Sequence, residues 1–381
     1  MKTMGPMIEL RGMTWDHERG HAPLVAASAA FSRIEPGVSI RWDRRSLQDF
    51  EHFPVDVLAR SYDLIVMDHP HVGQLADGGA LLPLETFDRT AVKALEAASV
   101  GASFRSYLWG GHLWALPIDA AAQVQAYRPD RVDGPAKNWD TVMKLAEGGE
   151  VLCPLRAPHA LMCFFTLAAN AGTPCATTSG PLLPGDNALM TLERLKSIAA
   201  AVDPQCRQLD PIEALDLLAG DDRFTLAPLV YGYVPYAQPG FRSKTLRFAD
   251  IPALGPVGCA GSALGGTGLA VSAATEAPNA ARRFAFFVTS QEVQKGLYAS
   301  SSGQPGHRAA WLDARVNDAS GNFYRDTLAT LDGAWLRPRH AGYVAFQASA
   351  SLVIEDFLDG VIGASEAFRR LDAGFRRSFC P

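Results

Sequence analysis

The sequence predicts an α/β protein with two lobes. Its 381 residues are about two to three times the length of a usual domain, which favours two separate cores over one. Strand-like and helix-like segments alternate through residues 8–71, and this order predicts a parallel sheet with helices on its faces. After the Gly110-Gly111 turn, an extended run from Asp119 to Tyr127 is typical of chain that leaves one lobe for another.

Three strands are predicted in the first lobe, over residues 8–15, 37–45 and 63–67. Apolar residues recur at helical spacing over 22–34, so a helix should join the first two strands. The third strand shows no alternation of polar and apolar residues, which indicates a strand covered on both faces. Pro70 has no backbone donor and ends this strand, so we expect the segment Asp68-His69-Pro70-His71 to form the loop beyond it.

The second half of the chain is predicted to be mainly helical, with two further strands. Residues 140–200 have a helical pattern that is interrupted by an exposed loop over 170–187. One strand, over 222–236, ends in closely spaced tyrosines, and another over 264–273 opens on glycines. A helical pattern then runs from 278 to 298, and two helical segments separated by Gly360 close the chain.

Composition excludes several classes of protein. With 48% hydrophobic and 20% charged residues, the chain can bury a large core. A net charge of −5 and scattered basic residues argue against a nucleic-acid partner. The six cysteines contain no CxxC pair, so neither a zinc module nor a redox dithiol is indicated. Their even number permits disulfides, although isolated cysteines in such a chain are more often small buried hydrophobes.

The sequence shows no targeting or membrane segment. Its start, MKTMGPMIELRGMTW, passes into the first strand without the apolar stretch of a secretory signal, which favours a cytoplasmic location. The most apolar candidate for a span, residues 257–274, is rich in glycine and serine and is better interpreted as a loop that feeds a strand.

Polar residues follow each of the three strands of the first lobe, and we expect them to line a ligand site. Ligands of open α/β sheets bind at the carboxyl ends of parallel strands. The residues that the sequence places there are Trp15, Asp16, His17, Arg44, Asp68, His69, His71 and, at the crossing to the second lobe, Asp119.

Two interpretations of the Asp and His residues stay open. Carboxylate–histidine pairs tune a base toward neutrality, so Asp68, His69, Asp16 and His17 are candidates for acid–base catalysis if the protein is an enzyme. Alternatively, Asp16 and Asp68 cap the helices that follow, and the histidines satisfy backbone groups.

Aromatic and arginine side chains supply the remaining candidates. Trp15, Tyr231, Tyr233 and Tyr236 could stack on a sugar ring, although alternating tyrosines are also typical of a half-buried sheet. Arg156, Arg337 and Arg339 could hold a carboxylate or phosphate, or lie on the surface as ordinary arginines.

Other constellations are weaker. Cys163 and His159 lie four apart on a probable helix, but the apolar segment around Cys163 is typical of an inert buried thiol. The GGTG segment lacks both the phosphate-loop lysine and the GxGxxG spacing, so no nucleotide is supported. His69 and His71 lack further ligands in the sequence, and neither a metal nor a cofactor is expected.

Four stretches carry a resemblance to a known family: LPIDAAAQVQAYRPD, GGTGLAVSA, AARRFAFFVTSQEVQKGLYASSSGQPGHRAAW and WLRPRHAGYVAFQ. Their order and spacing resemble the extracellular solute-binding proteins of ATP-driven sugar importers, which have the periplasmic-binding-protein-like type II fold. The first looks like the crossing into the second lobe, and the second like the return strand whose loop touches ligand, which adds Thr267 to the candidates.

The resemblance implies lobes made of residues 1–118 plus 267–310 and 119–266 plus 311–381, hinged about a ligand cleft. It implies a periplasmic protein that captures a sugar-like ligand or small organic acid for the membrane subunits of an ABC importer. The missing signal and the titratable cluster favour a cytoplasmic enzyme on the same scaffold, performing elimination, isomerisation or hydrolysis, because this fold also resembles thiaminase I and some dehydratases. A cytoplasmic ligand sensor is a third hypothesis.

Overall fold

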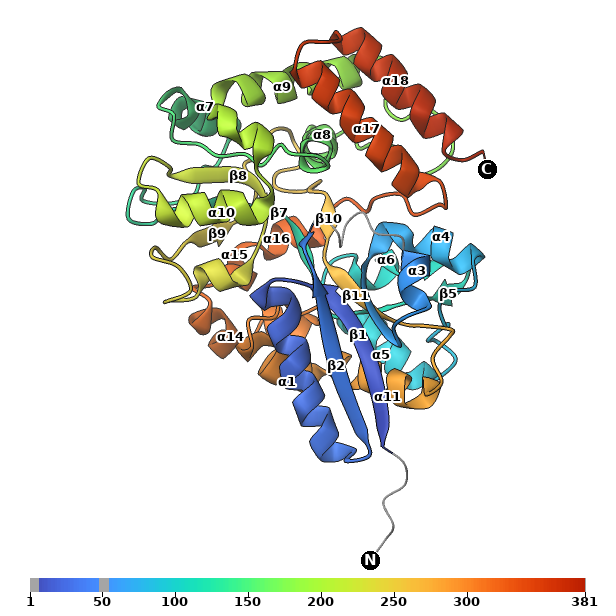
Figure 1. The fold of residues 1–381 in the computed structure, drawn as a ribbon. Coiled ribbons are helices and arrows are strands. Elements are labelled where there is room, and N and C mark those ends of the chain that lie inside the picture. The colour runs from blue at the N-terminus through green and yellow to red at the C-terminus, as the bar shows by residue number, and fades with distance from the viewer. Residues whose placement is uncertain (1–6, 48–54, 381) are drawn as a thin grey trace, which may run out of the picture. The chain divides into compact units, whose positions relative to one another are not determined.

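The computed structural model describes residues 7–47 and 55–380 and divides the chain into two compact units (Figure 1). Lobe 1 comprises Met1–Ala120 and Gly265–Val316, and lobe 2 comprises Ala121–Leu264 and Asn317–Pro381. The chain thus passes between lobes after residues 120, 264 and 316, where the sequence placed the crossings after 118, 266 and 310.

Lobe 1 is built on a five-stranded sheet with the order β2-β1-β3-β11-β6. Its strands are β1 (Ile8–Trp15), β2 (Val38–Arg45), β3 (Leu64–Asp68), β6 (Leu116–Pro117) and β11 (Thr267–Val271). The first three run parallel, which confirms the expected arrangement, whereas the returning β11 is antiparallel to β3 and β6. Because β3 lies inside the sheet, its four apolar residues are all buried, as the lack of alternation predicted.

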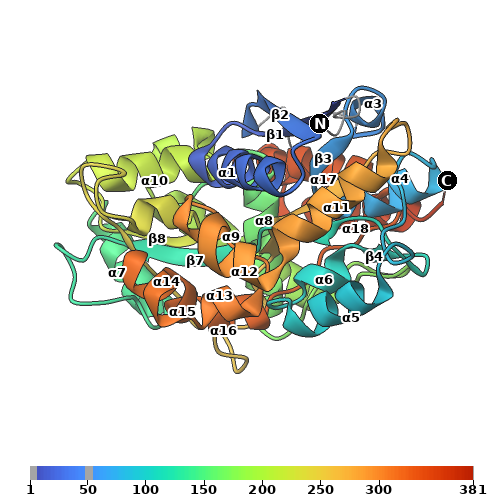
Figure 2. The ribbon, with the colours of Figure 1, turned by 90° about the horizontal axis from the view of Figure 1, so that it is seen from below.

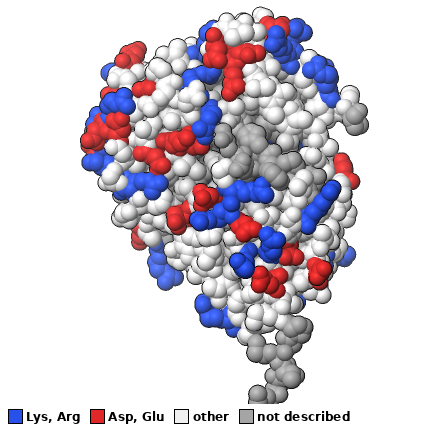
Figure 3. Space-filling model, viewed as in Figure 1, with Lys and Arg blue, Asp and Glu red and all other residues white. Residues whose placement is uncertain are grey.

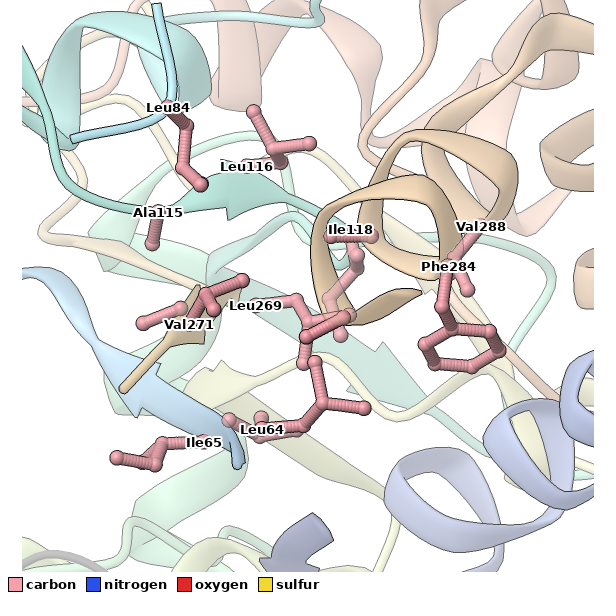
Figure 4. Packing of buried hydrophobic residues seen from close by; sticks show 14 of the residues in the cluster. Leu64, Ile65, Leu84, Ala115, Leu116, Ile118, Leu269, Val271, Phe284 and Val288 are labelled. Carbon is pink, nitrogen blue, oxygen red and sulfur yellow. The ribbon is translucent and has the colours of Figure 1, made fainter. Parts of the chain in front are cut away.

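Helices cover the lobe 1 sheet. They are α1 (Glu18–Ile34), α3 (Val55–Ala59), α4 (Val72–Asp77), α5 (Arg89–Ala98), α6 (Ser103–Ser106) and α11 (Pro278–Thr289). Helices α1 and α11 lie side by side (Figure 2). Phe31 of α1 packs between them, because its ring centroid lies 5.4 Å from those of Phe284 and Phe287 of α11. Beneath α11, Leu64 and Leu269 of adjacent strands pack with Phe284 in one core (Figure 4).

Lobe 2 has a smaller sheet and more helix. Strands β10 (Leu264–Gly265), β7 (Ala121–Tyr127) and β8 (Leu226–Tyr231) are neighbours in that order, and β9 (Arg247–Ala249) also pairs with β7. The helices include α7 (Trp139–Glu147), α8 (His159–Asn170), α9 (Gly185–Ala201), α10 (Pro211–Gly220), α17 (Tyr343–Leu358) and α18 (Ala364–Arg377). The loop expected over 170–187 and the break at Gly360 are both confirmed by the helix ends.

A buried ion pair joins the first turn of α1 to Asp119, close to the point where the chain first leaves lobe 1. The Arg19 guanidinium donates from Nε to Asp119 Oδ2 at 2.8 Å and from Nη2 to Oδ1, so the contact is bidentate. The two side chains are only 4% and 0% exposed. Burial raises the pKa of Asp119, while the Arg19 charge and its hydrogen bond act in the opposite direction.

A second contact fastens the C-terminal helix of lobe 2. The His340 ring stacks on Phe379 with a 3.6 Å centroid separation, and its Nε2 lies 2.7 Å from Ser378 Oγ. Ser378 donates its own proton to the Phe375 carbonyl, so His340 Nε2 must be the donor. A Cβ on Gly342 would lie 2.0 Å from the Ser378 carbonyl oxygen, so the close approach of chain here requires glycine.

We expect Arg19→Met to lower the free energy of unfolding by about 3–5 kcal/mol, because removal of one partner leaves an uncompensated buried charge. Arg11 pairs with Asp43 in the same lobe with both side chains about half exposed, so Arg11→Met should cost only about 0–1 kcal/mol. Urea denaturation of both variants tests this. Equal losses for the two would contradict the structural role given to the Arg19–Asp119 pair.

Acid should loosen the C-terminal helix through His340. Burial lowers the pKa of this imidazole from 6.5, and its buried Nδ1 has no hydrogen-bond partner among the described residues. The neutral ring is therefore favoured in the folded state, and its contribution to stability is present above pH 6.5 and lost as the pH falls below it. Thermal unfolding of His340→Phe should show a shallower loss of stability between neutral and acidic pH than the parent. An unchanged slope in His340→Phe would contradict this role of the His340 imidazole.

Candidate functional site

The candidate ligand-binding residues of lobe 1 lie together at one edge of its sheet. The parallel strands β1, β2 and β3 present their carboxyl ends there, and the antiparallel β11 begins there. Thr267 pairs in register with Asp68, and Thr267 also exchanges backbone hydrogen bonds of 3.0 and 3.1 Å with Asp119. The residues brought to this edge are Trp15, Asp16, His17, Arg44, Asp68, His69, His71, Asp119 and Thr267.

The segment after β1 begins α1 with a histidine cap. His17 Nδ1 accepts the backbone N–H of Arg19 at 3.0 Å, so this nitrogen carries no proton while the cap is made. The interpretation of Asp16 as the cap is wrong, because its carboxylate instead pairs with Arg44 at 3.0 Å. Trp15 is buried against Gly20, where a Cβ would lie 2.4 Å from the indole, and the Arg19 guanidinium lies 5.9 Å from its ring centroid. The capping His17, the Arg19 guanidinium and the Trp15 indole are thus packed together at the end of β1.

The segment after β3 forms one turn of 3₁₀ helix over His69–His71 where a loop was expected. Pro70 does end the strand, and Asp68 caps the turn by accepting the His69 N–H at 2.9 Å, so the capping interpretation of Asp68 is confirmed. Asp68 Oδ1 also lies 3.2 Å from His69 Nδ1. The His69 ring is buried and meets Tyr107 edge-on with centroids 6.4 Å apart. The imidazole therefore lies between the Asp68 carboxylate and the Tyr107 ring.

Asp119 and Thr267 differ in what their side chains offer. The Asp119 carboxylate is already engaged by Arg19, a residue that no local sequence signal pointed to, since the two lie 100 positions apart. Thr267 Oγ1 is buried and makes no hydrogen bond to any residue that the structure describes. A buried hydroxyl without a partner costs about 1–3 kcal/mol, so a ligand that supplies the missing bond would be favoured at this position.

In lobe 2 the tyrosines separate into two environments. Tyr231 ends β8 opposite Gln123, and its ring meets that of His159, the first residue of α8, with centroids 6.3 Å apart. Tyr233 is buried just beyond it. Tyr236 is fully buried, its hydroxyl lies 2.7 Å from Asp216, and burial raises its pKa, so its assignment to a ligand platform is wrong.

The arginines and Cys163 are held within lobe 2. Arg337 is buried and donates to Gln347 at 3.2 Å, so it is not an ordinary surface residue. Arg156 pairs with Asp210 and Glu213. Cys163 is fully buried, which agrees with the interpretation of an inert thiol, and all six cysteines are free.

A metal centre and a membrane-spanning helix are both absent from the described part of the chain. Residues 7–47 and 55–380 contain no cluster of three or more His, Cys, Asp or Glu side chains suited to a metal ion, and none of their helices is long and apolar enough to cross a membrane. Lys and Arg side chains are interspersed with Asp and Glu over the face seen in Figure 3. A continuous basic surface, which nucleic acid would need, is not seen on that face.

Comparison with known proteins agrees with this architecture. A family model described as bacterial extracellular solute-binding protein matches residues 15–149. Maltose-bound MalE3 of T. maritima has a TM-score of 0.83 at 17% identity, covering 97% of this chain and 99% of that chain. An ABC transporter solute-binding protein of Thermotoga lettingae TMO with bound α-D-tagatose also has a TM-score of 0.83, at 16% identity, covering 98% and 100%. Another, from Agrobacterium vitis S4 with bound D-mannitol, has 0.74 at 16% identity, covering 97% and 98%.

At these identities the solved structures establish the fold, and the family model adds a sequence match that begins at Trp15, on the candidate edge itself. Over residues 15–149 the chain is similar in sequence to the bacterial extracellular solute-binding proteins, and over nearly its whole length it shares the fold of solved solute-binding structures, in agreement with the resemblance that the order of its segments indicated.

Proposed function

We propose that the protein captures a small sugar or polyol for an ABC-type importer, with the edge of the lobe 1 sheet as its principal binding surface. The observation that carries this proposal is the convergence there of Asp68, His69 and the buried Thr267 hydroxyl, which makes no hydrogen bond to any of residues 7–47 and 55–380. Solved structures of the same fold that hold maltose, tagatose and mannitol support this ligand class. The membrane subunits of the importer are the proposed partners.

The chemistry of this edge suits hydroxyl groups. A sugar hydroxyl both donates and accepts a hydrogen bond, so it pairs with a carboxylate, an imidazole or another hydroxyl. Asp68 caps the 3₁₀ turn and His69 is the first, buried residue of that turn, so little side-chain freedom is lost on binding. Trp15, the buried last residue of the neighbouring strand β1, is the proposed aromatic residue of this surface. Tyr231, Tyr233 and Arg337 of lobe 2 are proposed as further ligand contacts.

A second candidate function rests on one distance. The 3.2 Å approach of Asp68 Oδ1 to His69 Nδ1 places a carboxylate beside an imidazole, and acid–base catalysis uses these two groups. An enzyme built on this pair would perform acid–base chemistry on a small metabolite, such as elimination, isomerisation or hydrolysis.

The purified protein should first be incubated with a metabolite pool that includes maltose, tagatose, ribitol and mannitol, and the mixture followed by mass spectrometry. Retention of a sugar or polyol without change is the result we expect. Consumption of a compound would establish the enzyme and overturn the importer function. If nothing is retained or consumed, the ligand class proposed here is wrong.

With a retained compound as probe, Asp68→Asn and His69→Ala should each weaken binding by about tenfold or more, because each loses a hydrogen bond to a charged or oriented group. Isothermal titration calorimetry measures this. The chain offers a matched control in Glu85 and His112, another carboxylate–imidazole pair of lobe 1, with a separation of 2.6 Å and the imidazole half exposed. Glu85→Gln and His112→Ala should leave affinity unchanged. Equal effects at both pairs would mean that the binding surface lies elsewhere.

A further inference from the structure

Three of the six cysteines meet inside lobe 2, although they come from three separate segments of the chain. Cys153 follows the bridge of Val151 to β8, Cys163 lies on α8, and Cys206 lies in the short helix η2 (Pro204–Gln208). The sulfurs of Cys153 and Cys163 are 3.9 Å apart, and Cys206 Sγ accepts the Cys153 backbone N–H at 3.3 Å. All three residues have no exposed surface.

The surroundings of this thiol cluster hold Cys163 toward Cys153. Gln123 of β7 donates from Nε2 to Cys163 Sγ at 3.4 Å, and its Oε1 accepts a hydrogen bond from the Thr166 hydroxyl. Thr166 Oγ1 in turn accepts the Ala263 N–H at 2.9 Å. Both polar atoms of the Gln123 amide therefore make hydrogen bonds, Oε1 with Thr166 and Nε2 with Cys163, and the second bond holds the Cys163 sulfur in place.

We propose that Cys153 and Cys163 form a disulfide when the chain folds in the presence of a small-molecule disulfide such as oxidised glutathione. The sulfurs are 3.9 Å apart and must approach to about 2.05 Å for the bond to form. The inference does not depend on the proposed ligand function.

The reaction balances as two thiol–disulfide exchanges. One cysteine thiolate attacks oxidised glutathione, forms a mixed disulfide and releases one glutathione. The second cysteine attacks the protein sulfur of that mixed disulfide, the Cys153–Cys163 bond forms, and a second glutathione leaves. The two cysteines lose two protons and two electrons, and the glutathione disulfide is reduced by the same amount.

Burial decides when this reaction occurs. The contact with Cys163 and the loss of solvent both raise the pKa of Cys153, so the nucleophilic thiolate is scarce in the folded lobe. Exchange is therefore slow in the native protein and fast while the segment is still exposed during folding. Once formed, the bridge would tie the chain just before α8 to the helix whose first residue, His159, contacts Tyr231.

The test refolds the full chain from urea in a buffer of reduced and oxidised glutathione, with a parallel sample in reducing buffer. Alkylation under denaturing conditions should modify two fewer thiols in the glutathione sample than in the reduced sample. Before alkylation, the intact protein from the glutathione sample should be lighter by the mass of two hydrogens. Trypsin cuts after Lys144, Arg156, Arg194 and Arg207, which puts Cys153, Cys163 and Cys206 on different peptides. The expected product is residues 145–156 linked to 157–194, and a second digestion after Phe164 or Phe165 separates Cys163 from Cys175.

Two variants complete the design. Cys163→Ala should abolish the bridge, whereas Cys206→Ala, which alters the same cluster, should retain it. Circular dichroism verifies that both refold. Six alkylated thiols in the oxidised sample, or a bridge to Cys175, Cys206, Cys259 or Cys380 in the parent, would overturn the proposal.

Discussion

Lobe 1 depends on the pairing of Asp119 with Thr267, where the chain that leaves the lobe lies against the chain that returns. Their two backbone hydrogen bonds set where β11 begins. Because β11 is antiparallel to β3, this start places Thr267 directly opposite Asp68. The Asp119 carboxylate then holds Arg19, and with it the first turn of α1 that follows Trp15, Asp16 and His17. One pairing thus aligns three segments of the candidate surface.

The candidate residues of lobe 1 also serve the fold. His17 caps α1, Asp68 caps the 3₁₀ turn, and Asp16 pairs with Arg44 across neighbouring strand ends. Such contacts limit the rotamers of these side chains before any ligand arrives, which lowers the entropy lost on binding. The structural and the functional interpretations of Asp68 are therefore compatible, and its cap is a reason to expect a well-ordered site.

In lobe 2, a network of buried hydrogen bonds holds the side chains in place. Gln123 connects β7 to α8 through Cys163 and Thr166, and Ser262 donates to the Gln123 carbonyl at 2.6 Å. In a low-dielectric interior such satisfied networks hold their members firmly. The same network brings the thiols of Cys153 and Cys163 together and supports the helix that begins at His159 beside Tyr231.

By itself the sequence determined the local features: the three parallel strands, the end of β3 at Pro70, the loop before α9 and the break at Gly360. These follow from periodicity, proline and glycine, which act within a few residues. Only the tertiary structure decided that Arg19 neutralises Asp119, that Asp16 pairs with Arg44 while His17 caps α1, and that Tyr236 belongs to the core whereas Tyr231 lies against His159. Partners that lie 20 positions apart, as Asp216 and Tyr236 do, or 100 apart, as Arg19 and Asp119 do, leave no mark in local pattern, because the geometry that joins them is created by packing.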